Sequence, residues 1–147
     1  MFLVQQISLP IISTPPVSQA PYRPGLNWKG KVKEAVEKLL HAGFVRPSTS
    51  PWSSPVIPVP KPDGSIRLVV DYRAVNRLTQ VDRYPLPRLD ELLAQVGKAK
   101  FLTTLDLSQG YHQVPLTEES VPKTAFITTF GKFEYVRLPF GLVNAPI

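Results

Sequence analysis

Two proline-rich stretches limit where regular structure can form in this chain. Of 17 prolines in 147 residues, five lie between Pro10 and Pro24 and six between Pro47 and Pro62. Proline lacks a backbone N–H and its ring fixes φ, so neither stretch can be a helix or a central strand throughout. We therefore expect an extended lead-in over residues 1–28 and an extended segment over residues 48–62.

Hydrophobic periodicity predicts two amphipathic helices. The first covers residues 29–40, with Gly43 as its C-terminal stop. Its inward face would comprise Val32, Val36, Leu39 and Leu40. The second covers residues 86–96 and ends at Gly97. Its inward face would comprise Leu89, Leu92, Leu93 and Val96.

Two hairpins and one further strand are predicted between and after these helices. An edge strand around residues 56–59 and a strand over 66–72 flank a turn signal at residues 62–65. Residues 125–138 predict a second hairpin that turns near Gly131-Lys132. Residues 101–107 predict a buried strand, followed by one helical turn over 108–112. Helices and strands mix without regular βαβ alternation, so the expected fold class is α+β.

Charge and composition narrow the possible functions. The 17 basic and 11 acidic side chains give a net charge of +6, which favours a polyanionic partner, nucleic acid first. A solvated basic surface is the plainer alternative. There is no cysteine, which excludes disulfides and thiolate metal sites. With neither a basic signal-peptide region nor an apolar run of about 20 residues, we expect an intracellular protein that is not secreted and has no membrane partner.

Asp106 is the candidate catalytic and metal-binding residue. It ends an apolar, strand-like run, and a glycine and an aromatic residue follow within five positions. A carboxylate at a strand end can hold Mg²⁺, which prefers carboxylate and phosphate oxygens. The alternative is that Asp106 caps the following turn by accepting a backbone hydrogen bond.

Lys61 and Arg67 flank the Asp-Gly turn and are candidate ligands of a triphosphate. A turn confined to residues 63–64 would pair Lys61 with Ile66 and turn Arg67 to the other face. A loop over residues 62–66 would place Lys61 opposite Arg67 on one face, where both could serve one phosphate group. The alternative is that they are ordinary charges protecting an edge strand from aggregation.

Two further segments carry candidate nucleotide-binding residues. After Gln109, Gly110 permits close backbone approach, and Tyr111 offers a rigid face for a sugar or base. Phe140 lies in a tight loop over residues 138–146 that could lie beside the same site. The alternatives are a core tyrosine, a turn glycine and a loop that enters a helix. Both histidines, His41 and His112, are expected to be structural.

A series of motifs resembles the reverse transcriptases of gypsy-type LTR retrotransposons in order and spacing over about residues 20–147. The matching segments are 44–55 (FVRPSTSPWSSP), 61–64 (KPDG), 70–76 (VDYRAVN), 84–87 (YPLP), 105–107 (LDL), 110–113 (GYHQ), 123–126 (KTAF) and 138–146 (LPFGLVNAP). The resemblance implies part of a right-hand polymerase: fingers at residues 29–81 and 115–138, and palm at 82–114 and from 139 to 147.

The resemblance also assigns roles. Asp106 corresponds to the first carboxylate that holds two Mg²⁺ ions. The backbone N–H groups of Gln109 and Gly110 would face the triphosphate of a deoxynucleotide. Tyr111 would stack under the incoming sugar and exclude a 2′-hydroxyl. In addition, Lys61 and Arg67 would grip the triphosphate and Phe140 would lie near the nucleotide and the template. The implied partners are deoxynucleoside triphosphates and an RNA or DNA template-primer.

One departure from the family pattern concerns the metal site. The family's next motif, two adjacent aspartates, would lie beyond Ile147, and the thumb, RNase H and integrase portions are absent from these 147 residues. We therefore expect a fragment of an RNA-directed DNA polymerase from a retrotransposon polyprotein. With one of three carboxylates, it would hold two Mg²⁺ ions poorly and would not synthesise DNA alone. The alternatives are a non-catalytic nucleic-acid-binding module and a non-functional remnant of a retroelement.

Overall fold

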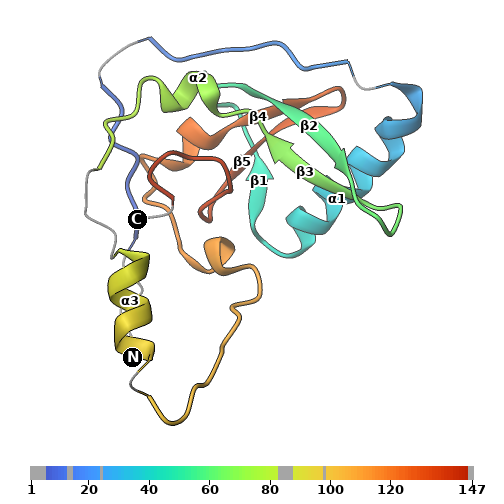
Figure 1. Ribbon diagram of the computed structural model, residues 1–147. Helices are drawn as coiled ribbons and strands as arrows, with labels where there is room; N and C mark the ends of the chain where they lie inside the picture. The colour runs from blue at the N-terminus through green and yellow to red at the C-terminus, as the bar shows by residue number, and fades with distance from the viewer. Residues whose placement is uncertain (1–5, 13–14, 24, 83–87, 98, 146–147) are drawn as a thin grey trace.

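The structure, a computed structural model, describes residues 6–12, 15–23, 25–82, 88–97 and 99–145. Five strands form one sheet in the order β1-β5-β4-β2-β3. The strands are β1 (Val45–Pro47), β2 (Ser54–Pro60), β3 (Ile66–Val70), β4 (Phe126–Thr128) and β5 (Gly131–Tyr135). The helices are α1 (Lys29–His41), α2 (Arg73–Asn76) and α3 (Leu89–Val96), with 3₁₀ turns η1 (Leu26–Trp28), η2 (Gly110–Gln113) and η3 (Val121–Thr124). This arrangement confirms the α+β class (Figure 1).

Helix α1 forms as predicted and packs against β3. Val32 and Val36 are buried beneath it. The helix ends in a Schellman motif, because Gly43 adopts a φ of 69° and the Phe44 N–H donates back to the Leu39 carbonyl at 3.0 Å. The predicted glycine stop is therefore confirmed.

The backbone N–H groups of β2 point alternately to the two sides of the strand, which explains how β2 accommodates Pro58 and Pro60. Only its first two residues pair with β4, in parallel, and the rest pairs antiparallel with β3. The Ser54 N–H donates to the Ala125 carbonyl, so the even-numbered residues of β2 direct their N–H groups toward the β4 side. Pro58 and Pro60 share this parity and lie past the end of β4. Their missing donors face the side on which no described strand continues.

The β4–β5 hairpin is confirmed, but its predicted turn is wrong by two residues. Thr128 pairs with Gly131, so the turn is Thr129-Phe130. The Thr128 hydroxyl stabilises this turn by donating to the Gly131 carbonyl at 2.8 Å and accepting from the Phe130 N–H at 3.3 Å. A Cβ on Gly131 would lie 3.2 Å from the Phe133 ring. That glycine therefore serves close packing and not the turn.

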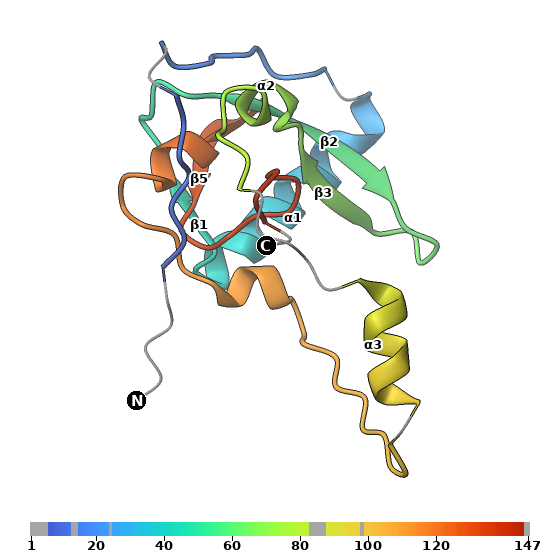
Figure 2. The same cartoon turned by 60° about the vertical axis from the view of Figure 1, so that its left-hand side comes forward.

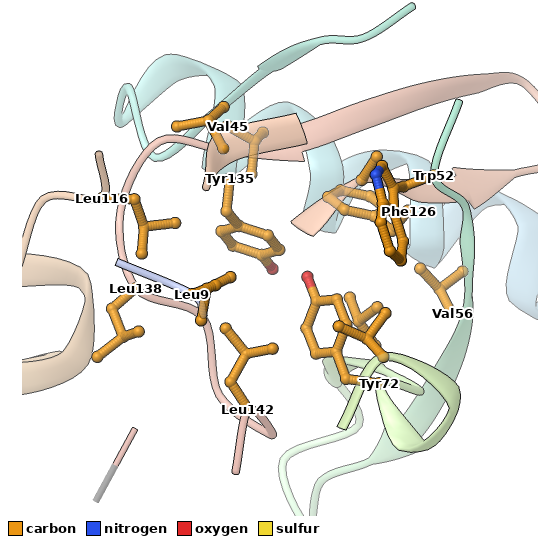
Figure 3. Packing of buried hydrophobic residues seen from close by; sticks show 14 of the residues in the cluster. Leu9, Val45, Trp52, Val56, Tyr72, Leu116, Phe126, Tyr135, Leu138 and Leu142 are labelled. Atoms are coloured by element: carbon orange, nitrogen blue, oxygen red, sulfur yellow. The ribbon is translucent and has the colours of Figure 1, made fainter. Parts of the chain in front are cut away.

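The lead-in is an integral part of the fold. Residues 6–12 and 15–23, here called the strap, run extended along the sheet body, as expected, and η1 follows at residues 26–28. Leu9 is 2% exposed, and its backbone is fixed on both sides. Its N–H donates to the Ser120 hydroxyl and its carbonyl accepts from Lys123 Nζ, both at 2.7 Å. Figure 3 shows Leu9 beside Leu138 and Leu142 in the core.

A buried carboxylate fastens the far end of the strap. Asp71 accepts two hydrogen bonds from the Arg73 guanidinium, at 2.8 and 2.6 Å, and one from the Tyr22 hydroxyl at 3.0 Å. The Arg73 hydrogen bonds hold the pKa of the Asp71 carboxyl well below its usual value, outweighing the effect of burial. The ionised form of Asp71 therefore stabilises the fold.

Helix α3 forms, but its predicted inward face is wrong. The exposed fractions of Leu89 and Leu93 are 71% and 60%. Residues 101–107 were predicted to be a buried strand, yet they form no strand and Phe101 is 92% exposed. Figures 1 and 2 both show α3 and residues 101–107 projecting from the sheet body. No described segment covers this surface, so an amphipathic pattern there has nothing to pack against. The part of the second predicted helix before residue 88 lies outside the described residues.

The core gathers side chains from the strap, the sheet and the C-terminal loop (Figure 3). Tyr72 is 1% exposed, and its hydroxyl donates to the Thr124 carbonyl at 2.8 Å. Burial raises the pKa of this phenol well above its usual value, so it remains a neutral donor. Across the described residues, every helix is too short or too polar to cross a bilayer.

Replacing Leu9 by alanine should lower the free energy of unfolding by about 2–4 kcal/mol, because it leaves a cavity in the core. Ile12→Ala is the matched control on the same strap, since Ile12 is 61% exposed. It should change stability by less than about 0.5 kcal/mol. Urea unfolding followed by circular dichroism measures both. Equal effects would show that the strap is not docked as described.

Replacing Asp71 by asparagine should destabilise the protein at neutral pH by about 2 kcal/mol, the scale of hydrogen bonds to a charged group. Folding lowers the pKa of Asp71, so its stabilisation is complete above the unfolded value of about 3.9 and is lost as pH falls toward the folded value. The gap between Asp71→Asn and wild type should therefore narrow from about pH 5 downward. Glu119→Gln, which neutralises an exposed carboxylate, is the control. A pH-independent gap would contradict the assignment.

Candidate functional site

The β2–β3 hairpin follows neither of the two predicted registers. Arg67 pairs with Val59, and the Lys61 N–H donates to the Ser65 carbonyl at 2.9 Å. Lys61 therefore lies opposite Ser65, and the loop is residues 62–64. Cross-strand partners share a face, and so do residues two apart along a strand. Lys61 and Arg67 consequently lie on the same face at diagonal positions.

The loop chemistry accounts for this register. Gly64 adopts a φ of 78°, which favours glycine. Asp63 Oδ1 accepts hydrogen bonds from the Ser65 N–H at 2.9 Å and the Ser65 hydroxyl at 2.6 Å. These local bonds favour a longer loop than a turn confined to residues 63–64.

The structure brings four of the predicted site residues to one cavity. A cavity of about 640 Å³ lies between α1, β3 and the C-terminal loop and is here called the hairpin cavity. Lys61, Arg67, Gln109 and Phe140 line it, together with Lys38 from α1. The remaining walls are mostly apolar. The cavity therefore combines cationic side chains with aromatic and aliphatic surface.

Gly110 and Tyr111 line an adjoining hollow of about 500 Å³, here called the tyrosine cavity. Gln109 and Phe140 line both cavities and so stand between them. Phe140 is also the centre of a stack. The Arg67 guanidinium carbon lies 5.0 Å from its ring centroid, and the Tyr111 ring meets it edge-on at 4.7 Å.

Helix α2 fixes the loop that carries Phe140. The Asn76 side chain donates to the Gly141 carbonyl at 2.8 Å and accepts from the Val143 N–H at 3.0 Å. Gly141 adopts a φ of 94°, and a Cβ there would lie 3.6 Å from the Val70 carbonyl. The predicted loop over residues 138–146 is thus tied to the end of β3 for as far as it is described.

Gln109 has a strained backbone at the junction of the cavities. Its φ of 50° and ψ of 46° are left-handed, and it is the single non-glycine residue with positive φ among the described residues. Such a conformation costs about 1–2 kcal/mol for a residue with a Cβ. The following turn, η2, confirms the helical turn expected near residues 108–112.

Asp106 stands apart from these side chains. It is exposed, and none of the hydrogen bonds or ion pairs of the described chain involves it. The turn that follows begins after Gln109 and has no side-chain cap, so the capping alternative is not observed. Its neighbour Leu107 lines the tyrosine cavity, whereas Asp106 lines neither cavity. In the described part of the chain, no group of three or more metal-ligating residues comes together.

Sequence reasoning assigned no site role to His112. It lines the hairpin cavity, is 8% exposed, and its ring centroid lies 4.7 Å from Phe44, 5.8 Å from Tyr135 and 5.6 Å from Phe140. Burial lowers the pKa of its imidazole. No local pattern predicts this cluster, because its members come from widely separated segments.

Comparison with known proteins identifies the class. Residues 59–147 match the reverse transcriptase (RNA-dependent DNA polymerase) family. The Pol polyprotein of the Drosophila melanogaster transposon opus is 46% identical over 136 residues, covering 89% of this chain and 14% of that protein. That of the D. melanogaster transposon gypsy is 48% identical over 120 residues, covering 78% of this chain and 12% of that protein.

Solved structures agree. The prototype foamy virus protease-reverse transcriptase matches with a TM-score of 0.85 and 33% identity, over 98% of this chain and 19% of that one. The foamy viral enzyme in complex with an RNA/DNA hybrid matches with a TM-score of 0.81 and 29% identity, with the same coverage of 98% and 19%. The chain belongs to the reverse transcriptase family, in the branch that includes LTR retrotransposon polyproteins. It spans 14% or less of the length of these curated relatives.

Proposed function

We propose that this chain forms the nucleotide-binding part of the polymerase active site of a retrotransposon RNA-directed DNA polymerase. One observation carries the proposal. Lys61 and Arg67 from the β2–β3 hairpin line a single cavity with Gln109 and Phe140, which come from two later segments. Four residues assigned by family motifs are thereby adjacent in space.

Within this proposal, the sheet body corresponds to the fingers and the projecting segment to the palm. All five strands fall within residues 29–81 and 115–138, the ranges assigned to the fingers. Helix α3 and residues 101–107 fall within 82–114, the range assigned to the first part of the palm, and lie apart from the sheet (Figure 2). Residues 139–147 would begin the return to the palm.

The cavities suggest how a deoxynucleoside triphosphate would bind. Lys61 and Arg67 would neutralise phosphate charge from one face of the hairpin. The backbone N–H groups of Gln109 and Gly110 would donate to the triphosphate. Tyr111 would pack under the sugar from the tyrosine cavity, supported edge-on by Phe140.

Asp106 would supply one ligand of a Mg²⁺ site. A carboxylate without a hydrogen-bond partner in the described chain has both oxygens free for a hard cation. When bound, Mg²⁺ would offset triphosphate charge and favour ionisation of the primer hydroxyl. The described residues bring together no group of three or more possible metal ligands, at Asp106 or elsewhere. Among the described residues a two-ion site would therefore be incomplete, and nucleotide binding would rest on the cations of the hairpin.

The net charge of +6 supports an RNA or DNA template-primer as the second partner. This extends the proposal from the nucleotide to the nucleic acid. The same proposal includes the alternative that the chain binds an RNA–DNA duplex without catalysing DNA synthesis.

Replacing Arg67 or Lys61 by glutamine should each weaken the binding of Mg·dTTP about tenfold, since each change removes one charge-assisted contact to phosphate. Isothermal titration calorimetry measures the dissociation constants. Arg77→Gln removes the same charge from an exposed position outside both cavities and is the control. A uniform weakening in all three variants would show a general charge effect and not a site.

The 147-residue chain should bind an RNA–DNA hybrid with an affinity that falls steeply with salt, yet fail to extend the primer with Mg²⁺ and deoxynucleotides. The physical reason is that one carboxylate holds two Mg²⁺ ions poorly. Gel-based primer extension and fluorescence anisotropy test the two statements. Template-dependent extension that disappears in Asp106→Ala would refute the expected inactivity, and salt-insensitive binding would contradict the nucleic-acid proposal.

A further inference from the structure

We infer that His112 is a positioning residue of the proposed nucleotide site, holding Gln109 in the conformation that the site requires. The inference rests on the proposed function, in which the backbone N–H of Gln109 donates to the triphosphate. It is carried by three observations that do not depend on family motifs: a hydrogen bond, a strained backbone and an aromatic cage.

The hydrogen bond joins the two side chains directly. His112 Nδ1 lies 3.1 Å from Gln109 Oε1. A carbonyl oxygen can only accept, so the imidazole donates from Nδ1, which fixes its tautomer. A second bond supports the same pair, because the His112 N–H donates to the Gln109 carbonyl at 2.9 Å. Gln109 is thus held through its side chain and its backbone.

Gln109 needs such support. Its left-handed backbone is unfavourable for a residue with a Cβ and persists only when neighbouring contacts hold it. Gln109 also lines both the hairpin cavity and the tyrosine cavity. A change in its φ and ψ would reorient its own N–H and that of Gly110, the two donors proposed for the triphosphate.

The imidazole is itself held by aromatic rings from three other segments. Phe44 follows α1, Tyr135 ends β5 and Phe140 lies in the C-terminal loop. The Tyr135 ring is stacked on His112 with an interplanar angle of 20°, and the Phe140 ring meets it edge-on at 75°. These contacts leave the His112 ring little freedom, so the direction of its Nδ1–H is fixed. Phe140 additionally links His112 to Arg67.

The surroundings keep this imidazole uncharged. Lys38 on α1, Lys61 and Arg67 on the hairpin, and Arg137 after β5 line the cavities that His112 also lines. No carboxylate is among the described residues that line them. Burial lowers the pKa of the imidazole and so disfavours a positive charge on the ring. The imidazole therefore acts as a fixed donor and not as a phosphate-binding cation.

A purely structural histidine predicts a different result from a positioning one. If His112 only filled the core, phenylalanine would replace it well and asparagine poorly. If it positions Gln109, asparagine should replace it well, since its side-chain N–H occupies nearly the place of Nδ1–H. Phenylalanine, which keeps the aromatic packing, should then fail. The two roles thus predict opposite rankings of the same two variants.

The experiment compares His112→Phe, His112→Asn and the control His41→Asn. His41 is exposed and bonds only within α1, to the Glu37 carbonyl. Each variant of the 147-residue chain is titrated with Mg·dTTP, and the backbone ¹³C shifts of Gln109 are recorded as a report of φ and ψ. All measurements are made below the lowest unfolding midpoint of the set.

We expect His112→Phe to keep the unfolding midpoint, shift the Gln109 carbons away from left-handed values and weaken dTTP binding about tenfold, the effect of one lost hydrogen bond. In His112→Asn the midpoint should fall while the Gln109 shifts and the affinity stay near wild type. His41→Asn should match wild type throughout.

Unchanged Gln109 shifts and affinity in His112→Phe would overturn the inference. The inference would also be overturned if the losses of dTTP affinity ranked the variants in the same order as their unfolding midpoints. If the wild-type chain does not bind dTTP at all, the proposed function fails. The Gln109 shifts then still decide whether His112 holds this residue, so the two failures are distinguishable.

Discussion

The register of the β2–β3 hairpin is the constraint on which the candidate site depends. A shift of one residue would turn Arg67 to the opposite face from Lys61, away from Phe140. Two features of the strands hold the register. Asp63 and Gly64 set a loop over residues 62–64. In addition, Pro58 and Pro60 of β2 are tolerated only while their missing N–H groups point away from β3. The same residues that make this stretch a poor strand by propensity therefore fix its alignment.

Much of the sheet body could be predicted from the sequence because its signals are local. Each of these signals determines the structure of residues only a few positions away. They are the apolar face of α1, the glycine after it and the turn residues of both hairpins. Where these signals failed, a side-chain contact between residues two apart decided the outcome, and residue type alone did not show it. Gly131 indicated a turn by residue type, but it lies after the turn, where it allows the Phe133 ring to pack closely. Lys61 and Arg67 were identified as a pair, while their register depended on side-chain bonds within the loop.

The predictions for α3 and residues 101–107 were wrong for another reason. Leu93 in α3 and Phe101 after it belong to patterns that indicate burial, yet both are exposed. A pattern records which face favours contact with other apolar groups, and it says nothing about what covers that face. The site residue missed in the sequence, His112, shows the converse. Its environment is built by Phe44, Tyr135 and Phe140, so no window of neighbouring residues contains the signal.

The two halves of the proposed chemistry rest on parts of the chain that differ in how well they are packed. Lys61, Arg67 and Phe140 are attached to the sheet body, which has one hydrophobic core. Leu9 of the strap belongs to that core. Asp106 belongs to residues 101–107, which are exposed and form no strand. Charge recognition of a triphosphate depends on the first group alone, whereas metal-assisted transfer needs the second held at a fixed distance from it. Gln109 lies between the two groups, only three residues after Asp106, and is fixed by the imidazole of His112. Gln109 is therefore the residue through which the packing of the sheet body can influence the position of Asp106, the carboxylate proposed to bind the metal ion.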